Sequence, residues 1–251
     1  MMEDVIVKQL KKSNFKKPII IEGLPGIGFV GKLAVDLIIK DKKMKKIIEI
    51  YSPHLPPEVD MQESGIIKPI SYEIYHTRCN GKDYVLLTGD AQPANPNGQF
   101  ILNKYIVDYL AKTKPELIIT LGGYATGKIE KECIVHGAVS EEKLIKDYKK
   151  LVTFGRSPGH IYGAAGQLLV FGMFHKIPGI CLMGSTHGSY IDAKAAKKLL
   201  IVLNKITDLD VDVKNLDEQI KNTDKIIKEL ENELKNLEGV TVKKPPEGSY
   251  L

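Results

Sequence analysis

The stretch "GLPGIGFVG", residues 23–31, determines how the chain begins to fold, because it joins an apolar run to an amphipathic segment. The run before it, residues 18–21, is typical of a strand. After it, apolar side chains recur at the i, i+3, i+4, i+7 and i+8 positions of a buried helix face, namely Val30, Leu33, Ala34, Leu37 and Ile38. The sequence therefore predicts a strand, a glycine turn and a helix, in that order.

The segments that follow alternate between strand and helix patterns. We expect strands at 45–52, 115–123 and 177–185, and helices at 97–113, 163–176 and 192–206. Residues 70–90 predict an antiparallel hairpin, because two β-rich runs flank Asn80-Gly81, a pair that tolerates the positive φ angles of a type I′ turn. Asp192 is a suitable N-cap for the last helix. The alternation indicates one α/β domain in which a hairpin lies beside parallel strands.

A different pattern begins after residue 215. Seven positions step alternately by four and three, as in the heptad seam of a coiled coil: Leu216, Ile220, Thr223, Ile227, Leu230, Leu234 and Leu237. Gly239 lies where a helix C-cap belongs, and Pro245-Pro246 cannot continue the helix. We expect a core domain (1–207), a heptad helix (208–238) and a flexible tail (239–251). Packing of this helix on the chain's own core is the alternative to a coiled coil.

Charge and hydropathy exclude two classes of partner. The net charge of +5 comes from lysines along the whole chain, with the densest cluster at residues 40–46. This cluster falls where the first helix should end, and cations there complement the helix dipole. No aromatic-interleaved basic motif accompanies it, so we expect no nucleic-acid partner. Because no stretch approaches the roughly 20 uninterrupted apolar residues of a membrane span, we expect no membrane partner.

The cysteines and the N-terminus indicate a cytoplasmic protein. Cys79, Cys133 and Cys181 are far apart and form no C-x-x-C motif. Their spacing argues against a disulfide framework and a cysteine zinc site, and suits a reducing compartment. Residues 1–18 carry charges inside any apolar segment, so we expect no signal peptide.

Two glycine motifs resemble nucleotide-binding turns. Gly26-x-Gly28-x-x-Gly31 has the dinucleotide spacing, but the second strand should end in an acidic residue and instead runs into Tyr51-Ser52-Pro53-His54. Residues 122–128, "GGYATGK", resemble a P-loop, but Ile129 stands where a serine or threonine should bind magnesium. We therefore expect no NAD(P), ATP or other cofactor, and we interpret the first motif as tight packing of a helix on a strand.

Glycine-rich segments gather at the expected strand ends, which line one rim of an open α/β sheet. Asp90, Gln92, His187 and Asp192 follow such ends and could share a cleft. There is, however, no G-x-S-x-G nucleophile motif and no histidine pair with metal-ligand spacing. We therefore expect no catalytic or metal site, although a phosphorylase-like or nucleotide-binding enzyme that uses this rim is the alternative.

Several segments together resemble one family. They are residues 23–39, "GLPGIGFVGKLAVDLII", residues 122–127, "GGYATG", residues 162–203 and a penultimate tyrosine. These segments resemble archaeal homologues of proteasome assembly chaperones, which are related to eukaryotic proteasome assembly chaperone 2. The resemblance implies a three-layer α/β core with a mixed, largely parallel sheet, similar to nucleoside phosphorylases but without their activity. It also implies homo-oligomers or a related chaperone subunit, and binding to 20S proteasome α-subunits.

The family's anchoring motif is a hydrophobic residue, a tyrosine and any residue at the C-terminus. Tyr250 and Leu251 match this motif, while Ser249 occupies the hydrophobic position. The residues themselves suit this role, because a short arm ending in a phenol and a free carboxylate can be captured by a pocket with backbone donors or a lysine. A frayed terminus is the alternative. The sequence therefore predicts a proteasome assembly chaperone that binds α-subunits through Ser249, Tyr250 and Leu251.

Overall fold

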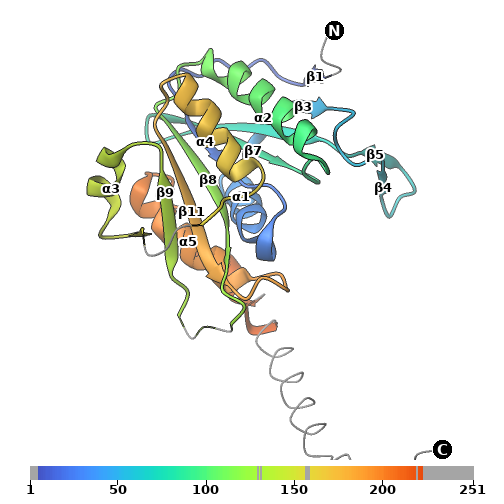
Figure 1. Ribbon diagram of the computed structural model, residues 1–251. Coiled ribbons are helices and arrows are strands. Elements are labelled where there is room, and N and C mark those ends of the chain that lie inside the picture. The colour runs from blue at the N-terminus through green and yellow to red at the C-terminus, as the bar shows by residue number, and fades with distance from the viewer. Residues whose placement is uncertain (1–4, 129, 131, 156–158, 219, 223–251) are drawn as a thin grey trace, which may run out of the picture.

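The computed structural model describes residues 5–128, 130, 132–155, 159–218 and 220–222. In this part of the chain nine strands form one mixed sheet, with helices on both faces (Figure 1). The strands are β1 (Ile6–Gln9), β2 (Ile19–Glu22), β3 (Lys45–Tyr51), β6 (Tyr72–Cys79), β7 (Lys82–Gly89), β8 (Leu117–Ala125), β9 (Val135–Val139), β10 (Thr153–Phe154) and β11 (Gly179–Thr186). Their order across the sheet is β1-β3-β6-β7-β2-β8-β11-β9-β10.

The sheet is parallel at its centre and antiparallel towards the β1 edge. The central block consists of four neighbouring strands that run parallel, namely β7, β2, β8 and β11. On the other side of β7 the pairs are antiparallel, in the order β7, β6, β3 and β1. The predicted hairpin is β6–β7, and its turn residues Asn80 and Gly81 have φ angles of 50° and 79°. These positive values are those of a type I′ turn. The expected hairpin beside parallel strands is therefore confirmed.

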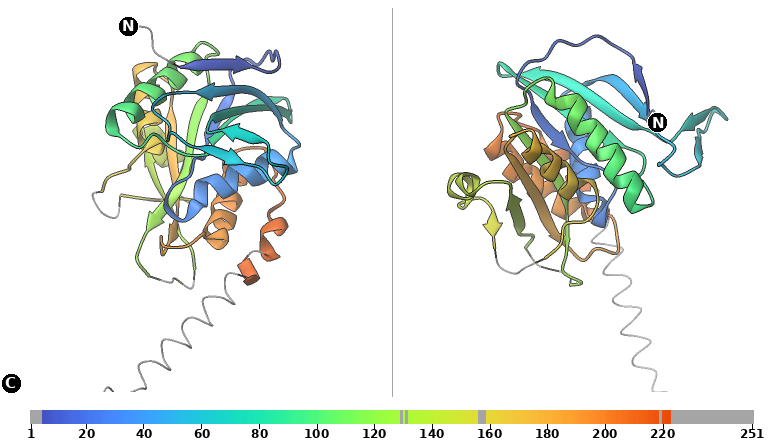
Figure 2. Two further views of the ribbon diagram at one scale, coloured as in Figure 1. Left: turned by 90° about the vertical axis from the view of Figure 1, so that its right-hand side faces the viewer. Right: turned by 45° about the horizontal axis from the view of Figure 1, so that its top comes forward.

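The helices form the outer two layers. They are α1 (Val30–Asp41), α2 (Pro96–Ala111), α3 (Glu142–Tyr148), α4 (Ala164–Phe174) and α5 (Ala193–Ile206), with 3-10 turns η1 (Ile27–Phe29) and η2 (Val213–Leu216). Figure 2 shows α2 and α4 over one face of the sheet, with α1 and α5 over the other. Ile19 and Ile21 of β2 point into the α1–α5 core and Ile20 into the α2–α4 core. This alternation explains why the strand is apolar throughout, and it confirms a three-layer α/β fold.

The glycine turn between β2 and α1 serves close packing. Gly28 has a φ of 60°, in the left-handed region that favours glycine. A Cβ atom on Gly31 would lie 2.1 Å from the carbonyl oxygen of Leu121, so α1 approaches β8 more closely than any side chain allows. The interpretation of this motif as helix–strand packing is confirmed.

The chain continues on the core after α5. Leu209, Val211 and Leu216 are buried within the α1–α5 core, and Ile220 packs against it. The side chain of Asn204 bonds both the backbone N–H and the carbonyl oxygen of Val211. The first two positions of the predicted seam therefore contact the chain's own core. Thr223, Ile227, Leu230, Leu234 and Leu237, like the tail, lie outside the described residues.

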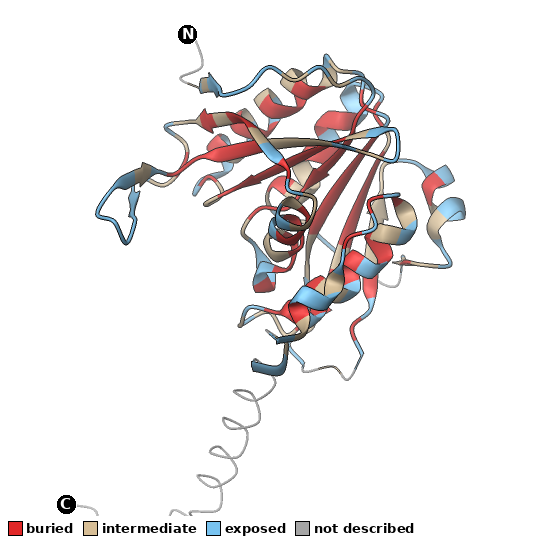
Figure 3. Ribbon diagram, turned by 180° about the vertical axis from the view of Figure 1, so that it is seen from behind, coloured by how far each residue is buried: buried red, intermediate tan, exposed pale blue. Residues whose placement is uncertain are grey.

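Several elements were not expected from the sequence, among them the short strands β1 and β10. β9 lies between β11 and β10, antiparallel to β11 and parallel to β10. α3 follows it in the chain, and β4 (Val59–Met61) pairs with β5 (Ile67–Pro69) in a separate hairpin. Figure 3 shows this hairpin extending from the body of the molecule, away from the buried central strands. The implied likeness to nucleoside phosphorylases stays a prediction.

Candidate functional site

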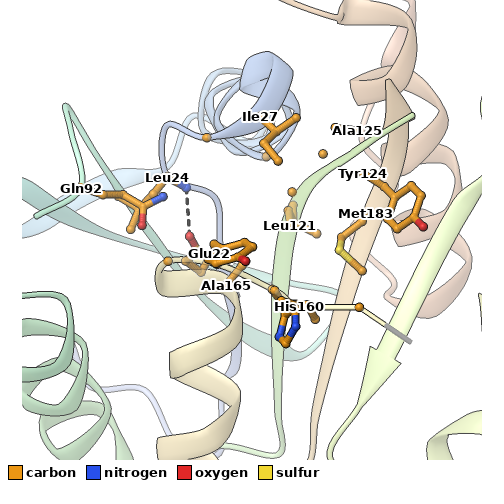
Figure 4. Close-up of a pocket in the computed structure, with 18 of the residues that line it drawn as sticks. Glu22, Leu24, Ile27, Gln92, Leu121, Tyr124, Ala125, His160, Ala165 and Met183 are labelled. Carbon is orange, nitrogen blue, oxygen red and sulfur yellow. Dashed lines mark hydrogen bonds between the residues drawn. The ribbon is translucent and has the colours of Figure 1, made fainter. Parts of the chain in front are cut away.

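A cavity opens at the carboxyl ends of β2 and β8, where the sequence placed the glycine-rich rim. Its volume is about 600 Å³. Figure 4 shows that its walls come from the β2–α1 turn, the end of β8, the start of α4 and β11. The lining residues include the glycines Gly26, Gly31, Gly122, Gly123, Gly159 and Gly163. A site on this rim is the usual place for a ligand in an open α/β sheet.

Glu22 is an acidic residue of this cavity that the sequence did not bring out as a candidate. It is the last residue of β2, and only 1% of its surface is exposed. Its Oε1 atom accepts a hydrogen bond of 3.0 Å from the backbone N–H of Leu24, whereas Oε2 has no partner among the described residues. Burial raises the pKa of the carboxyl group to about 8, although backbone hydrogen bonds oppose the shift. The signal in the sequence was a lone acid between an apolar run and a glycine turn.

Gln92 is the member of the predicted rim set that lines the cavity. Its Oε1 atom accepts a hydrogen bond of 2.9 Å from the backbone N–H of Ala164, the first residue of α4. Its Nε2 atom donates to the carbonyl oxygen of Pro25 at 2.8 Å. One side chain therefore holds the β2–α1 turn against the start of α4, which fixes the shape of the cavity.

Asp90, His187 and Asp192 are described by the structure but do not line this cavity. Asp90 accepts hydrogen bonds from Lys68 and the backbone N–H of Ser71. The Nδ1 atom of His187 lies 2.7 Å from the Ser189 hydroxyl oxygen. Asp192 caps α5, as expected, by accepting a hydrogen bond from the Ala195 N–H. The sequence therefore located the rim correctly, but it did not identify which side chains point into the cavity.

An apolar surface lies on α4 and the neighbouring part of α2. Its exposed members, defined here as the α4 surface, are Phe100, Val170, Met173 and Phe174, which are between 47% and 75% exposed. Phe171 links them, because its ring contacts those of Phe100 and Phe174 with centroid distances of 5.1 and 6.2 Å. Contiguous exposed apolar groups of this kind mark interaction sites.

The β4–β5 hairpin carries a second set of exposed apolar side chains, Val59, Met61, Ile66 and Ile67, which are 55% to 80% exposed. Lys68, on β5, forms an ion pair of 3.0 Å with Asp90 at the end of β7. This pair ties the base of the hairpin to the sheet while its apolar side chains remain open to a partner.

Among the residues that the structure describes, no group of three or more His, Cys, Asp or Glu side chains could hold a metal ion. None of the helices described combines the length and the apolar character needed to cross a membrane.

Comparisons with known proteins give matches over nearly the whole chain. The sequence profile of the PAC2 family matches residues 20–231. The uncharacterized protein MJ1210 of Methanocaldococcus jannaschii is 34% identical over 215 residues, which are 85% of this chain and 83% of that protein.

Two solved structures from Pyrococcus furiosus are similar in both sequence and fold. PbaB, an archaeal proteasome activator, is 35% identical with a TM-score of 0.86, and the match covers 92% of this chain and 100% of that one. PbaA, an archaeal homolog of proteasome-assembly chaperone, is 27% identical with a TM-score of 0.76, over 92% of this chain and 94% of that one. These matches confirm the resemblance that the sequence segments indicated.

Proposed function

Because the chain belongs to the PAC2 family, we propose that it acts as a proteasome assembly chaperone-like protein in the cytoplasm and binds 20S proteasome α-subunits. The observation that carries this proposal is the similarity to PbaB, which spans 92% of this chain and all of that proteasome activator. The similarity to PbaA supports it from a second structure, a homolog of proteasome-assembly chaperone.

We propose that the terminal residues Ser249, Tyr250 and Leu251 form the anchor. Tyr250 offers a ring with an apolar body and a hydroxyl group that can form a hydrogen bond in a pocket. The terminal carboxylate of Leu251 adds a charge that a lysine or backbone N–H groups of the partner can bind. Ser249 buries little apolar area, so this anchor is weaker than one with a larger apolar residue there.

The target that these similarities favour is the mature 20S particle. The identity and TM-score are higher for the proteasome activator, at 35% and 0.86, than for the homolog of proteasome-assembly chaperone, at 27% and 0.76. An activator acts on a finished particle, whereas an assembly chaperone binds its precursors. Assistance in α-ring assembly is the second candidate, and both functions use the same terminal anchor.

The α4 surface is the contact that we propose between copies of this chain. The exposed side of α4 is apolar, because Val170, Met173 and Phe174 repeat there at i, i+3 and i+4. Phenylalanine and methionine are both enriched at the cores of protein interfaces. A homo-oligomer would present several tails at once, and linked binding sites raise the overall affinity without new contacts.

The rim cavity favours this binding function over a phosphorylase-like enzyme. A phosphate-using site needs cationic or N–H donors around the anion. The described residues that line the cavity include neither lysine nor arginine, and they include the carboxyl group of Glu22. The described lining is therefore poor in the cationic side chains that a phosphate-using enzyme would need.

Size-exclusion chromatography tests the proposed function. The purified chain should co-elute with mature 20S proteasome, and electron microscopy of the complex should place it on the α-rings at the ends of the particle. Co-elution with isolated α-subunits alone would favour the assembly function. If the chain co-elutes with neither, proteasome binding is wrong.

A further inference from the structure

The cavity at the ends of β2 and β8 contains a buried carboxyl group whose second oxygen is left without a partner. Buried side-chain oxygens are normally paired, and leaving one unpaired destabilises the fold. Oε2 of Glu22 is such an atom, and Glu22 lines a cavity of about 600 Å³. This volume lies within the range of small-molecule sites, about 300 to 1,000 Å³. The carboxyl group that needs a partner therefore lies at the wall of a cavity large enough for a small molecule.

The rest of the lining defines what the partner should look like. Leu24, Leu121 and Met183 form an apolar wall, and Tyr124 and Tyr162 add aromatic rings. Figure 4 shows Glu22 between Leu24 and Ala165 on one side of the cavity, with Tyr124 and Met183 on the other. A planar apolar body fits between these walls, and a cationic group suits both the carboxylate and the aromatic faces.

The geometry points to a small-molecule site in which Glu22 binds the cationic group of an organic amine with a planar apolar body. The described lining residues include no lysine or arginine, and the titratable side chains that face the cavity besides Glu22 are His160, Tyr124 and Tyr162. The cavity is formed by the core and not by the terminal tail, so this proposal and proteasome binding can fail separately.

The electrostatics of Glu22 give the site a measurable signature. Two buried neighbours, Tyr72 of β6 and Cys181 of β11, respond to the charge of Glu22. Burial together with that charge raises the pKa of both side chains. With a pKa of about 8, the free carboxyl group is largely protonated at neutral pH. A bound cation favours the ionised form. Binding of an amine near pH 7 should therefore release close to one proton from Glu22.

Tryptamine is a suitable probe, because it joins an indole ring to an ammonium group. Indole-3-acetamide and indole-3-acetate are controls of similar size that are neutral and anionic. Isothermal titration calorimetry of the full chain should detect tryptamine binding at least about tenfold tighter than either control, which is the size of one charge-assisted interaction. Titrations in phosphate and Tris buffers should reveal the released proton as a difference in apparent enthalpy.

Variants assign the effect to the cavity. Glu22→Gln keeps the shape of the neutral acid and should weaken tryptamine binding at least about tenfold and abolish proton release. Tyr124→Ala, on the opposite wall, should weaken binding without changing proton release. Glu142→Gln, which removes an exposed carboxylate on α3, should change neither. Circular dichroism checks folding, and the wild-type proton release tests the proposal without any variant.

Three results would overturn the proposal: no tryptamine binding at millimolar concentration, equal affinity for the amine and the carboxylate probes, or unchanged binding by a folded Glu22→Gln variant.

Discussion

Glu22 should make the stability of the fold fall as the pH rises. Burial raises the pKa of this carboxyl group from its ordinary value of 4.5 to about 8. Between these two values the folded chain keeps a proton that the unfolded chain has lost, so the free energy of unfolding falls by about 1.4 kcal/mol for each pH unit. The stabilisation is fully present below the unfolded pKa, and between about pH 5 and pH 8 the loss sums to about 3 to 4 kcal/mol.

The variant Glu22→Gln removes this dependence, since glutamine is neutral and keeps an oxygen for the Leu24 N–H. Urea unfolding of both proteins at the two pH values measures the effect. We expect the stability of the variant relative to wild type to increase by about 3 to 4 kcal/mol from the lower to the higher pH. Glu142→Gln, an exposed carboxylate on α3, is the matched control and should show no such trend. A relative stability that changes by less than about 1 kcal/mol would refute the argument.

Three further predictions concern packing and assembly. Gly31→Ala should destabilise the fold by more than about 4 kcal/mol in urea unfolding, because the new Cβ atom would lie 2.1 Å from the Leu121 carbonyl oxygen. Gly122→Ala is the control: the atom nearest to its new Cβ is 3.9 Å away, so its stability should stay within about 1 kcal/mol of wild type. Phe174→Glu should lower the oligomer mass measured by light scattering, because it places a charge in the proposed interface. Lys150→Glu, at an exposed position on a different segment, is the control and should leave the mass unchanged. Leu230→Asp, in the predicted heptad seam, should alter partner binding, oligomer size or stability, and if all three are unchanged the seam buries nothing.

The sequence predicted the centre of the fold because local signals and packing agree there. The alternation of apolar strands with helical stripes gave β2, α1, β8, α4, β11 and α5, and Asn80-Gly81 gave the β6–β7 turn. β9 and α3 were missed, since β9 pairs with strands distant in sequence and is only partly buried. Pairing partners of such a strand are set by tertiary contacts that periodicity does not contain.

The candidate site was predicted in position but not in chemistry. Glycine-rich strand ends indicated the rim, and Gln92 lines it as expected. Asp90 and Asp192 were equally plausible in the sequence, but the structure uses them for an ion pair and a helix cap. Glu22 was overlooked because burial of an acid depends on the three-dimensional surroundings of the strand end, not on its neighbours in sequence.

The central claim is that the chain binds the 20S proteasome through its last three residues. Three proteins should be compared by biolayer interferometry for binding to mature 20S proteasome and to isolated α-subunits: the full-length chain, a variant that lacks Ser249, Tyr250 and Leu251, and a variant with one residue added after Leu251. Circular dichroism is the folding control. Ser249→Leu serves as the gain-of-affinity variant and should tighten binding by about 1 to 2 kcal/mol if the pocket is apolar. Loss of an aromatic anchor costs about 2 kcal/mol or more, so truncation should weaken binding by about thirtyfold or abolish it, and the extension should weaken it as well. Equal affinity of the full-length and truncated proteins would contradict the claim.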